Sequence, residues 1–226
     1  MINMVACIIP ARGGSKRIKN KNIVIINGLP MVAHAINIAK KSNIFSRIFV
    51  STESKKIQNI AIKYGAKCPN LRPKNLSGDK IPIFKVLKKS LNLFDISEEY
   101  ICCLYPTALF AKSIDLKKAF KKIVKTKSDF LCSVSKPNSH PLRSYIKRGK
   151  TIKYKWPKYS SYMSQDLPIF FNDNGSFSFY KTKMISRATT NNPPLNSTYY
   201  EQKNMNIDIN TYEDLNLAKQ LIKKNK

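Results

Sequence analysis

A basic, glycine-containing segment follows the first apolar run of the chain, which ends at Pro10. The segment contains Gly13, Gly14 and Ser15, and its cations are Arg12, Lys16, Arg17, Lys19 and Lys21. Glycines allow backbone N–H groups to approach anionic oxygens closely, and cationic side chains offset the negative charge. A buried strand that opens into such a loop is typical of a phosphate-binding site.

The spacing differs from two common phosphate-binding motifs. The chain has no G-x-x-x-x-G-K-S/T segment, and Gly13 and Gly14 are adjacent rather than spaced as G-x-G-x-x-G. A solvated basic loop is the alternative, and composition alone does not separate the two interpretations. The order of a strand, small residues and then cations at Lys16 and Lys21 favours phosphate binding.

The elements that must position this loop follow an alternating pattern. Apolar runs predict strands at 5–10, 47–51, 66–69, 100–104 and 130–135, and amphipathic runs predict helices at 30–42, 54–64, 82–94 and 113–126. Ser113 is the expected cap of the last of these helices. The pattern predicts an α/β fold, a three-layer, doubly wound and mostly parallel sheet. Ligands bind beyond the carboxyl ends of such strands, where the basic loop, Ser51-Thr52 and Tyr105–Thr107 would meet.

The pattern changes after residue 136. Prolines and aromatic residues cluster, and alternation at 151–155 predicts a short hairpin strand. We interpret 138–172 as an aromatic-rich excursion that forms a dimer interface, the alternative being a lobe packed on its own core. A strand at 174–180, a loop at 187–198, a strand at 205–209 and a final helix capped by Thr211 and Asp214 are expected to follow.

Length and composition limit the class of protein. The 226 residues, 42% of them apolar, suit one domain spanning 1–226. No apolar stretch approaches the roughly 20 residues of a membrane span, and the first residues do not resemble a signal peptide. The five cysteines are Cys7, Cys68, Cys102, Cys103 and Cys132. They lie mostly in apolar runs without metal-ligand spacing, so reduced thiols and a cytoplasmic location are expected.

The net charge of +28 raises the question of nucleic acid as a partner. Basic surfaces attract phosphate backbones without sequence specificity. The lysines are spread over the predicted helix faces, and the chain has no recognition-helix, zinc-knuckle or aromatic RNP motif. We therefore interpret most lysines as solvated surface and do not expect a biological nucleic-acid partner.

The opening segment IPARGGSKRI…KNI and six further segments resemble one enzyme family. The six are GLPMVAHAI, IFVSTES, YGAKCPNLRPKNLSGD, CCLYPTALF, SQDLPIFFNDNGSF and NIDINTYEDLNLA. They are similar to the acylneuraminate cytidylyltransferases (CMP-sialic acid synthetases) and, more closely, to pseudaminic acid cytidylyltransferases. The resemblance implies a nucleotide-diphospho-sugar transferase-like fold and a homodimer. It also implies an enzyme that uses CTP and Mg²⁺ to activate a nonulosonic acid, a nine-carbon acidic sugar, with release of pyrophosphate.

The same resemblance implies roles for individual residues. Arg12, Lys16 and Lys21 match the catalytic positions that contact the triphosphate, with help from the backbone of Gly13, Gly14 and Ser15. Asn22 matches a nucleotide-contacting position. Arg72 matches an arginine that reads cytosine, whose O2 and N3 are both acceptors. Ser77 and Asp79 are expected to line the same pocket.

The expected metal ligands are Asp208 and Asn210. Alternate residues of a strand share a face, so both side chains could offer oxygens to one Mg²⁺. The family usually has D-x-D here. Because the amide of Asn210 carries no charge, we expect weaker metal binding. A structural carboxylate at a strand end is the alternative for Asp208.

Sugar specificity depends on three segments. Tyr105 stands where sialic acid enzymes of the family have Gln and pseudaminic acid enzymes have an aromatic residue. Gln165 and Asp173 lie in segments that also resemble the pseudaminic group, although Asn172 replaces the usual His and Ser176 replaces Gln. The sequence favours pseudaminic acid. A CMP-N-acetylneuraminate or CMP-legionaminate synthetase, or a CTP-binding homologue with weakened catalysis, remains the alternative.

Overall fold

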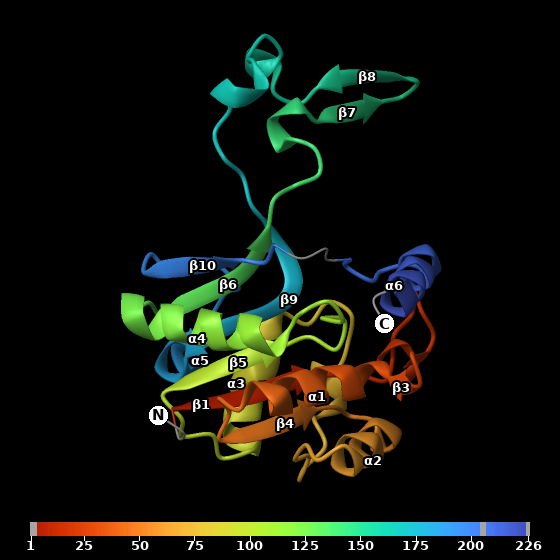
Figure 1. Ribbon diagram of the computed structural model, residues 1–226, viewed down its shortest axis with the longest axis vertical. Coiled ribbons are helices and arrows are strands. Elements are labelled where there is room, and N and C mark those ends of the chain that lie inside the picture. The colour runs from red at the N-terminus through yellow and green to blue at the C-terminus, as the bar shows by residue number, and fades with distance from the viewer. Residues whose placement is uncertain (1–3, 204–206, 225–226) are drawn as a thin grey trace.

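A six-stranded sheet lies at the centre of the computed structural model, which describes residues 4–203 and 207–224 (Figure 1). Its strand order is β10-β6-β9-β5-β1-β4. Four strands begin and end at the predicted residues: β1 (Val5–Pro10), β4 (Arg47–Ser51), β5 (Tyr100–Leu104) and β6 (Phe130–Ser135). The expected fold class is confirmed.

The two remaining strands complete one half of the sheet. β9 (Asn172–Lys181) runs antiparallel between β5 and β6, and β10 (Ser197–Glu201) pairs in parallel with β6 at the edge. The chain leaves β1 for β4 on one side and returns to β5 on the other. This reversal is the point at which ligands bind in open α/β sheets.

Helices cover both faces of the sheet (Figure 1). α1 (Met31–Ser42), α2 (Lys55–Lys63) and α4 (Ser113–Thr126) pack on the side of β1 that presents Cys7 and Ile9. α3 (Ile83–Leu93) and α5 (Thr182–Arg187) pack on the other side, against Ala6 and Ile8. β1 is therefore buried on both faces, which explains its continuous apolar sequence.

A third, smaller apolar cluster holds the end of the basic loop. After the 3-10 turn η1 (Lys21–Ile23), β2 (Ile25–Ile26) and β3 (Leu29–Pro30) form a tight hairpin. Its turn residues Asn27 and Gly28 have φ of 48° and 80°, the conformation that Asn-Gly adopts most readily. The final helix, α6 (Tyr212–Lys224), packs Leu215 and Ala218 into this cluster. The hairpin thus links the basic loop to α6.

The excursion expected at 138–172 projects from the sheet as an arm (Figure 1). It leaves the end of β6 and returns into β9. The predicted hairpin strand is confirmed as β8 (Thr151–Tyr154), which pairs with β7 (Tyr145–Arg148). Three 3-10 turns complete the arm: η3 (Pro141–Arg143), η4 (Pro157–Tyr159) and η5 (Ser164–Asp166). Ile152, Met163 and Ile169 are exposed on it.

Four local predictions are wrong. The residue that caps α4 is Lys112, because its own N–H donates to the Asp115 carboxylate at 2.9 Å, and Ser113 is already helical. The strand expected at 66–69 is reduced to one bridge between Phe49 and Lys67. The loop expected at 187–198 is shorter, since α5 ends at 187 and β10 begins at 197. Of the strand expected at 205–209, residues 205 and 206 lie outside the described residues and 207–209 are not a strand.

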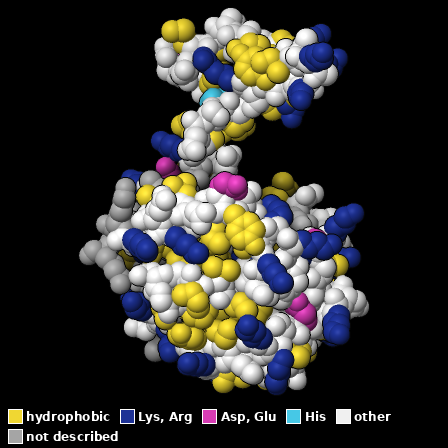
Figure 2. All heavy atoms as spheres, turned by 90° about the vertical axis from the view of Figure 1, so that its right-hand side faces the viewer, with side chains coloured by type: hydrophobic (Ala, Val, Ile, Leu, Met, Phe, Trp, Pro, Cys, Tyr) yellow, Lys and Arg dark blue, Asp and Glu magenta, His cyan; other side chains and the backbone are white. Residues whose placement is uncertain are grey.

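The distribution of basic side chains and the length of the helices bear on nucleic acid and membranes as partners. Figure 2 shows Lys and Arg side chains spread over one face of the body and arm rather than gathered in a single basic patch. None of the helices in the described parts of the chain is sufficiently long and apolar to cross a membrane.

Candidate active site

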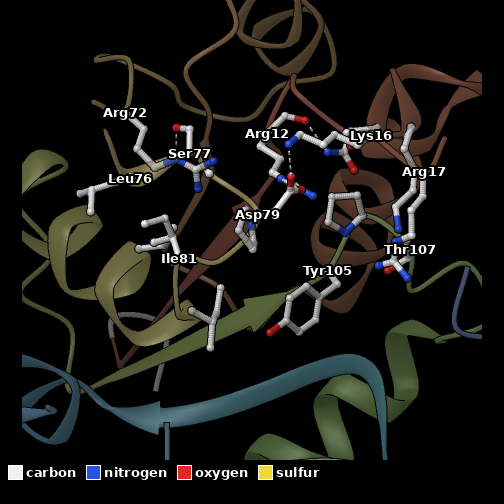
Figure 3. Close-up of a pocket in the computed structure, with 18 of the residues that line it drawn as sticks. Arg12, Lys16, Arg17, Arg72, Leu76, Ser77, Asp79, Ile81, Tyr105 and Thr107 are labelled. Carbon is white, nitrogen blue, oxygen red and sulfur yellow. Dashed lines mark hydrogen bonds and ion pairs between the residues drawn. The ribbon is translucent and has the colours of Figure 1, made fainter. Parts of the chain in front are cut away.

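A cavity of about 220 Å³ opens beyond the carboxyl ends of β1 and β5 (Figure 3). The basic loop after β1 forms one wall, and the 72–86 segment forms another. Tyr105, Pro106 and Thr107, which follow β5, complete it. This is the edge of the sheet at which the sequence predicted a ligand.

Three hydrogen bonds hold the basic loop in place, two to residues at and just beyond the end of β4 and one within the loop segment itself. The N–H of Ala11 donates to the carbonyl of Ser51 at 2.9 Å, and the side-chain amide of Asn22 donates to the carbonyl of Arg12 at 2.8 Å. The N–H of Gly13 donates to Oε1 of Glu53 at 2.7 Å. A Cβ on Gly13 would lie 3.0 Å from Cβ of Ser54, so this close approach favours glycine.

Two cations of the loop engage one carboxylate. Arg12 forms an ion pair with Asp79, and Nζ of Lys16 lies 3.4 Å from Oδ2 of the same residue. The hydrogen bond from Arg12 holds the pKa of Asp79 below its usual value, with a further contribution from Lys16. Figure 3 shows Arg12 and Asp79 directed toward each other across the cavity. The two cations of the loop are therefore paired with an anionic group at the cavity.

Lys21 connects the cavity to the expected metal ligands. Its Nζ donates to the carbonyl of Ile209 at 2.5 Å. Burial lowers the pKa of Lys21, and the negative charge of Asp208 opposes this effect. The amide of Asn210 donates to Oδ2 of Asp208 at 2.6 Å. Asp208 and Asn210 therefore lie together beside Lys21, but not on the strand that was expected to align them, and their role as metal ligands stays a prediction.

Arg72 is only 4% exposed and has two side-chain partners. Its Nε donates to Oγ of Ser77 at 3.1 Å, and its Nη2 lies 3.4 Å from Oε2 of Glu53. Burial lowers the pKa of Arg72, whereas the charge of Glu53 raises it. The guanidinium lines the cavity and remains charged, so it can donate hydrogen bonds to a ligand.

Tyr105 follows β5 directly and lines the cavity floor. Its N–H donates to the carbonyl of Ser176 at 3.0 Å. Burial raises the pKa of Tyr105 well above its ordinary value, and the charge of Asp173 adds to the effect. The phenol therefore stays protonated and can act as a donor. Asp173 itself accepts from the N–H of Gly175 at 2.9 Å.

The cavity unites most of the predicted site. The predicted residues that line it are Arg12, Ser15, Lys16, Lys21, Asn22, Arg72, Ser77, Asp79 and Tyr105. Asp173, Asp208 and Asn210 adjoin it through Tyr105 and Lys21. Gly13 and Gly14 are not among the lining residues, and contact between their backbone and a triphosphate stays a prediction. Gln165 lies in η5 of the arm and is not among the residues that line this cavity.

Arg17 and Thr107 also line the cavity, at the edge of the sheet where the sequence placed them. The apolar side chains that line it were not anticipated, and they are Leu76, Ile81, Ile83 and Val86. Glu53 contacts both the loop and Arg72 from behind. Its only sequence signal is its position just after β4, at the edge where ligands bind. Within the described residues, no group of three or more His, Cys, Asp or Glu side chains could hold a metal ion alone.

The mostly parallel sheet with helices on both faces is a fold found in nucleotidyltransferases. The family model described as "Cytidylyltransferase" matches residues 6–226, so the chain belongs to the cytidylyltransferase family. The expected family and the expected class of enzyme, a CTP-using nucleotidyltransferase, are confirmed.

Two relatives and one solved structure are similar to nearly the whole chain. The pseudaminic acid cytidylyltransferase of Campylobacter jejuni is 34% identical over 97% of this chain and 96% of its own. The CMP-N,N'-diacetyllegionaminic acid synthase of Legionella pneumophila is 30% identical over 98% of this chain and 97% of its own. A CMP:2-keto-3-deoxy-manno-octonic acid synthetase solved with CTP shares the fold, with a TM-score of 0.75 at 12% identity over 99% of this chain and 100% of its own.

Proposed function

We propose that this enzyme transfers CMP from CTP to pseudaminic acid, with release of pyrophosphate. The observation that carries the proposal is the convergence of Arg12, Lys16, Lys21 and Arg72 on one cavity. A hydroxyl of the sugar attacks the α-phosphorus, a P–O bond to the sugar forms, and the bond to the β-phosphate oxygen breaks. The hydroxyl proton passes to solvent or to pyrophosphate.

The cations lower the barrier by positioning and by neutralising charge. The triphosphate replaces the carboxylate of Asp79 on Arg12 and Lys16, since both anions need the same partners. Lys21 lies deeper, between the cavity and Asp208, and stabilises charge that develops at the reacting phosphate. Preorganised charges of this kind supply most of the rate enhancement in phosphoryl transfer. Arg72 directs its donors to the acceptors of cytosine.

Asp208 and Asn210 fit a magnesium ion through their chemistry. Both offer oxygen, the ligand atom that Mg²⁺ prefers, and phosphates and water complete its shell in many nucleotide sites. When bound, Mg²⁺ supplies further neutralisation of phosphate charge. The single carboxylate of this pair leaves the site less negative than two carboxylates would.

Restoring the second carboxylate is expected to strengthen metal binding. In Asn210→Asp, the Mg²⁺ concentration that gives half-maximal activity should fall by about tenfold, because a charged ligand replaces a neutral one. Activity titrated against Mg²⁺ at fixed CTP measures the change. An unaltered or higher Mg²⁺ requirement would count against Asp208 and Asn210 as the metal site.

The sugar is proposed from Tyr105 and from the relatives that carry the name pseudaminic acid. We propose that the Tyr105 side chain, which lines the cavity, contacts the sugar. N-acetylneuraminic and legionaminic acids are the competing substrates. The enzyme would be located in the cytoplasm, where CTP is made.

We also propose a homodimer in which residues 138–172 of each chain contact the other. The arm leaves the body of its own chain and exposes Ile152, Met163 and Ile169, with exposed fractions of 64%, 61% and 80%. Exposed apolar side chains on one projection are typical of an interface. Gln165 would then act in the partner's cavity. Light scattering after size-exclusion chromatography should give about twice the mass of one chain.

One assay tests the reaction and its substrate together. The protein is incubated with CTP, Mg²⁺ and each of the three nonulosonic acids, and products are identified by mass spectrometry while pyrophosphate is measured. The expected result is a CMP-sugar formed fastest with pseudaminic acid. Faster turnover of another nonulosonate would reassign the sugar. CTP binding without turnover of any would instead support a homologue with weakened catalysis.

A further inference from the structure

The carboxylate of Glu53 lies between the basic loop and Arg72, the two parts of the proposed nucleotide site. Its Oε1 accepts from the N–H of Gly13 at 2.7 Å, and its Oε2 lies 3.4 Å from Nη2 of Arg72. The side chain of Glu53 is 16% exposed and that of Arg72 is 3% exposed. Glu53 therefore touches the phosphate-binding loop with one oxygen and the arginine expected to read cytosine with the other.

The hydrogen bond with Gly13 fixes the position of the basic loop relative to the end of β4. A charged acceptor forms shorter and stronger hydrogen bonds than a neutral one. A Cβ on Gly13 would also lie 3.4 Å from Oε1 of Glu53, so loop and carboxylate are already close-packed. Glu53 thus holds the start of the basic loop against the turn that follows β4.

The contact with Arg72 fixes the direction of a buried cation. Ser77 accepts from Nε of Arg72, and Glu53 faces Nη2, so two partners define the plane of the guanidinium. Ser77 is neutral, and Glu53 is the one carboxylate that forms an ion pair with Arg72 among the described residues. Without it, a buried guanidinium would be left without a counter-charge and would seek another position.

The backbone around Glu53 supports the same arrangement. The N–H of Arg72 donates to the carbonyl of Thr52 at 2.7 Å, and the N–H of Ala11 donates to the carbonyl of Ser51 at 2.9 Å. The last residue of β4 contacts the basic loop and the next residue contacts the segment that holds Arg72, so the Glu53 side chain joins the two segments a second time.

We infer that Glu53 is a positioning residue that sets the aim of Arg72 and so the preference for CTP over UTP, an inference that rests on the proposed function. Arg72 has donors only. Cytosine N3 is an acceptor, whereas uracil N3 carries a proton and donates. A guanidinium held in one plane therefore binds cytosine more tightly than uracil. A guanidinium that is free to rotate discriminates less between the two bases.

The chain offers a matched control at the opposite end of the sheet. Glu98 is also a buried carboxylate paired with an arginine. It accepts from Nε of Arg47 at 2.8 Å and from Nη2 at 2.6 Å. Because Arg47 begins β4 whereas Glu53 follows its end, the second pair lies away from the cavity. Glu98→Gln therefore reports the cost of losing such a pair without touching the site.

The test compares Glu53→Gln with Glu98→Gln by calorimetric titration of CTP and UTP, which needs no sugar. Glutamine can still accept from Gly13 but offers no charge to Arg72. In Glu53→Gln, CTP should bind about 10–100-fold more weakly, the loss expected for one hydrogen bond to a charged group. UTP binding should change much less, so the CTP/UTP ratio falls. Glu98→Gln should lose stability while both dissociation constants stay as in the wild type.

Several outcomes would overturn the inference. One is an unchanged CTP/UTP ratio in Glu53→Gln, and another is an equal loss of both nucleotides. If Glu53→Gln does not fold, Glu53→Asp serves instead, since the shorter side chain cannot reach both partners and should lower the ratio. A wild type that binds CTP selectively but turns over no nonulosonate would refute the proposed reaction and leave the role of Glu53 intact.

Discussion

Replacing Lys21 by methionine should reduce kcat/KM for CTP by about 10²- to 10³-fold, the usual cost of removing one preorganised donor from the transition state. Methionine keeps most of the length and apolar volume of lysine, so the packing of the loop should survive. The half-buried Lys21 side chain lines the cavity, and the negative charge of Asp208 acts on it to raise its pKa against the effect of burial. Its loss removes positive charge at the point where the nucleotide and the expected metal meet. Initial rates of pyrophosphate release measure the effect.

Lys19→Met is the matched control. Lys19 belongs to the same loop, but its side chain is exposed and is not among the cavity residues. The same substitution there should leave kcat/KM within about twofold of the wild type, since one exposed charge has a small, screened effect. Equal losses in Lys19→Met and Lys21→Met would mean that the loop acts only through its net charge.

Replacing Phe179 by alanine should lower the free energy of unfolding by about 3–5 kcal/mol, the cost of a cavity left by a buried aromatic side chain. Phe179 is fully buried in β9, the antiparallel strand between β5 and β6. Its ring centroid lies 5.7 Å from that of Phe120 and 6.0 Å from that of Phe177. Both the apolar burial and these ring contacts would be lost. Urea unfolding followed by circular dichroism measures the change.

Leu195→Ala controls for the Phe179 substitution. Leu195 lies in the loop before β10 and is fully exposed, so its truncation should change the free energy of unfolding by less than about 0.5 kcal/mol. A loss below about 1.5 kcal/mol in Phe179→Ala would show that the strands around β9 can close the cavity, and that this part of the core is less rigidly packed than the structure indicates.

Four strands could be predicted to the residue because short, largely apolar runs give a plain signal. Val5–Pro10, Arg47–Ser51, Tyr100–Leu104 and Phe130–Ser135 are such runs. The edge strand β10 gives a weaker signal. β10 has mixed exposure and follows an Asn- and Pro-rich segment, so its local sequence resembles a loop until the parallel pairing with β6 is known.

The site could be predicted where chemistry is local in sequence. Arg12, Lys16 and Lys21 stand in one loop, and their types alone suggest an anion. Arg72 and Asp208 needed the family resemblance, because nothing near them in sequence distinguishes a buried arginine or a ligating carboxylate from a surface one. Glu53 was missed because its role depends on contacts with Gly13 and Arg72, which lie 40 and 19 residues away.

The most direct test of the account is a crystal structure of the protein with CTP. We expect the triphosphate to lie against Arg12, Lys16 and Lys21, with Asp79 displaced from Arg12 and the cytosine facing Arg72. Nucleotide bound elsewhere, or bound with its phosphates away from the loop after β1, would contradict the assignment of this cavity as the active site.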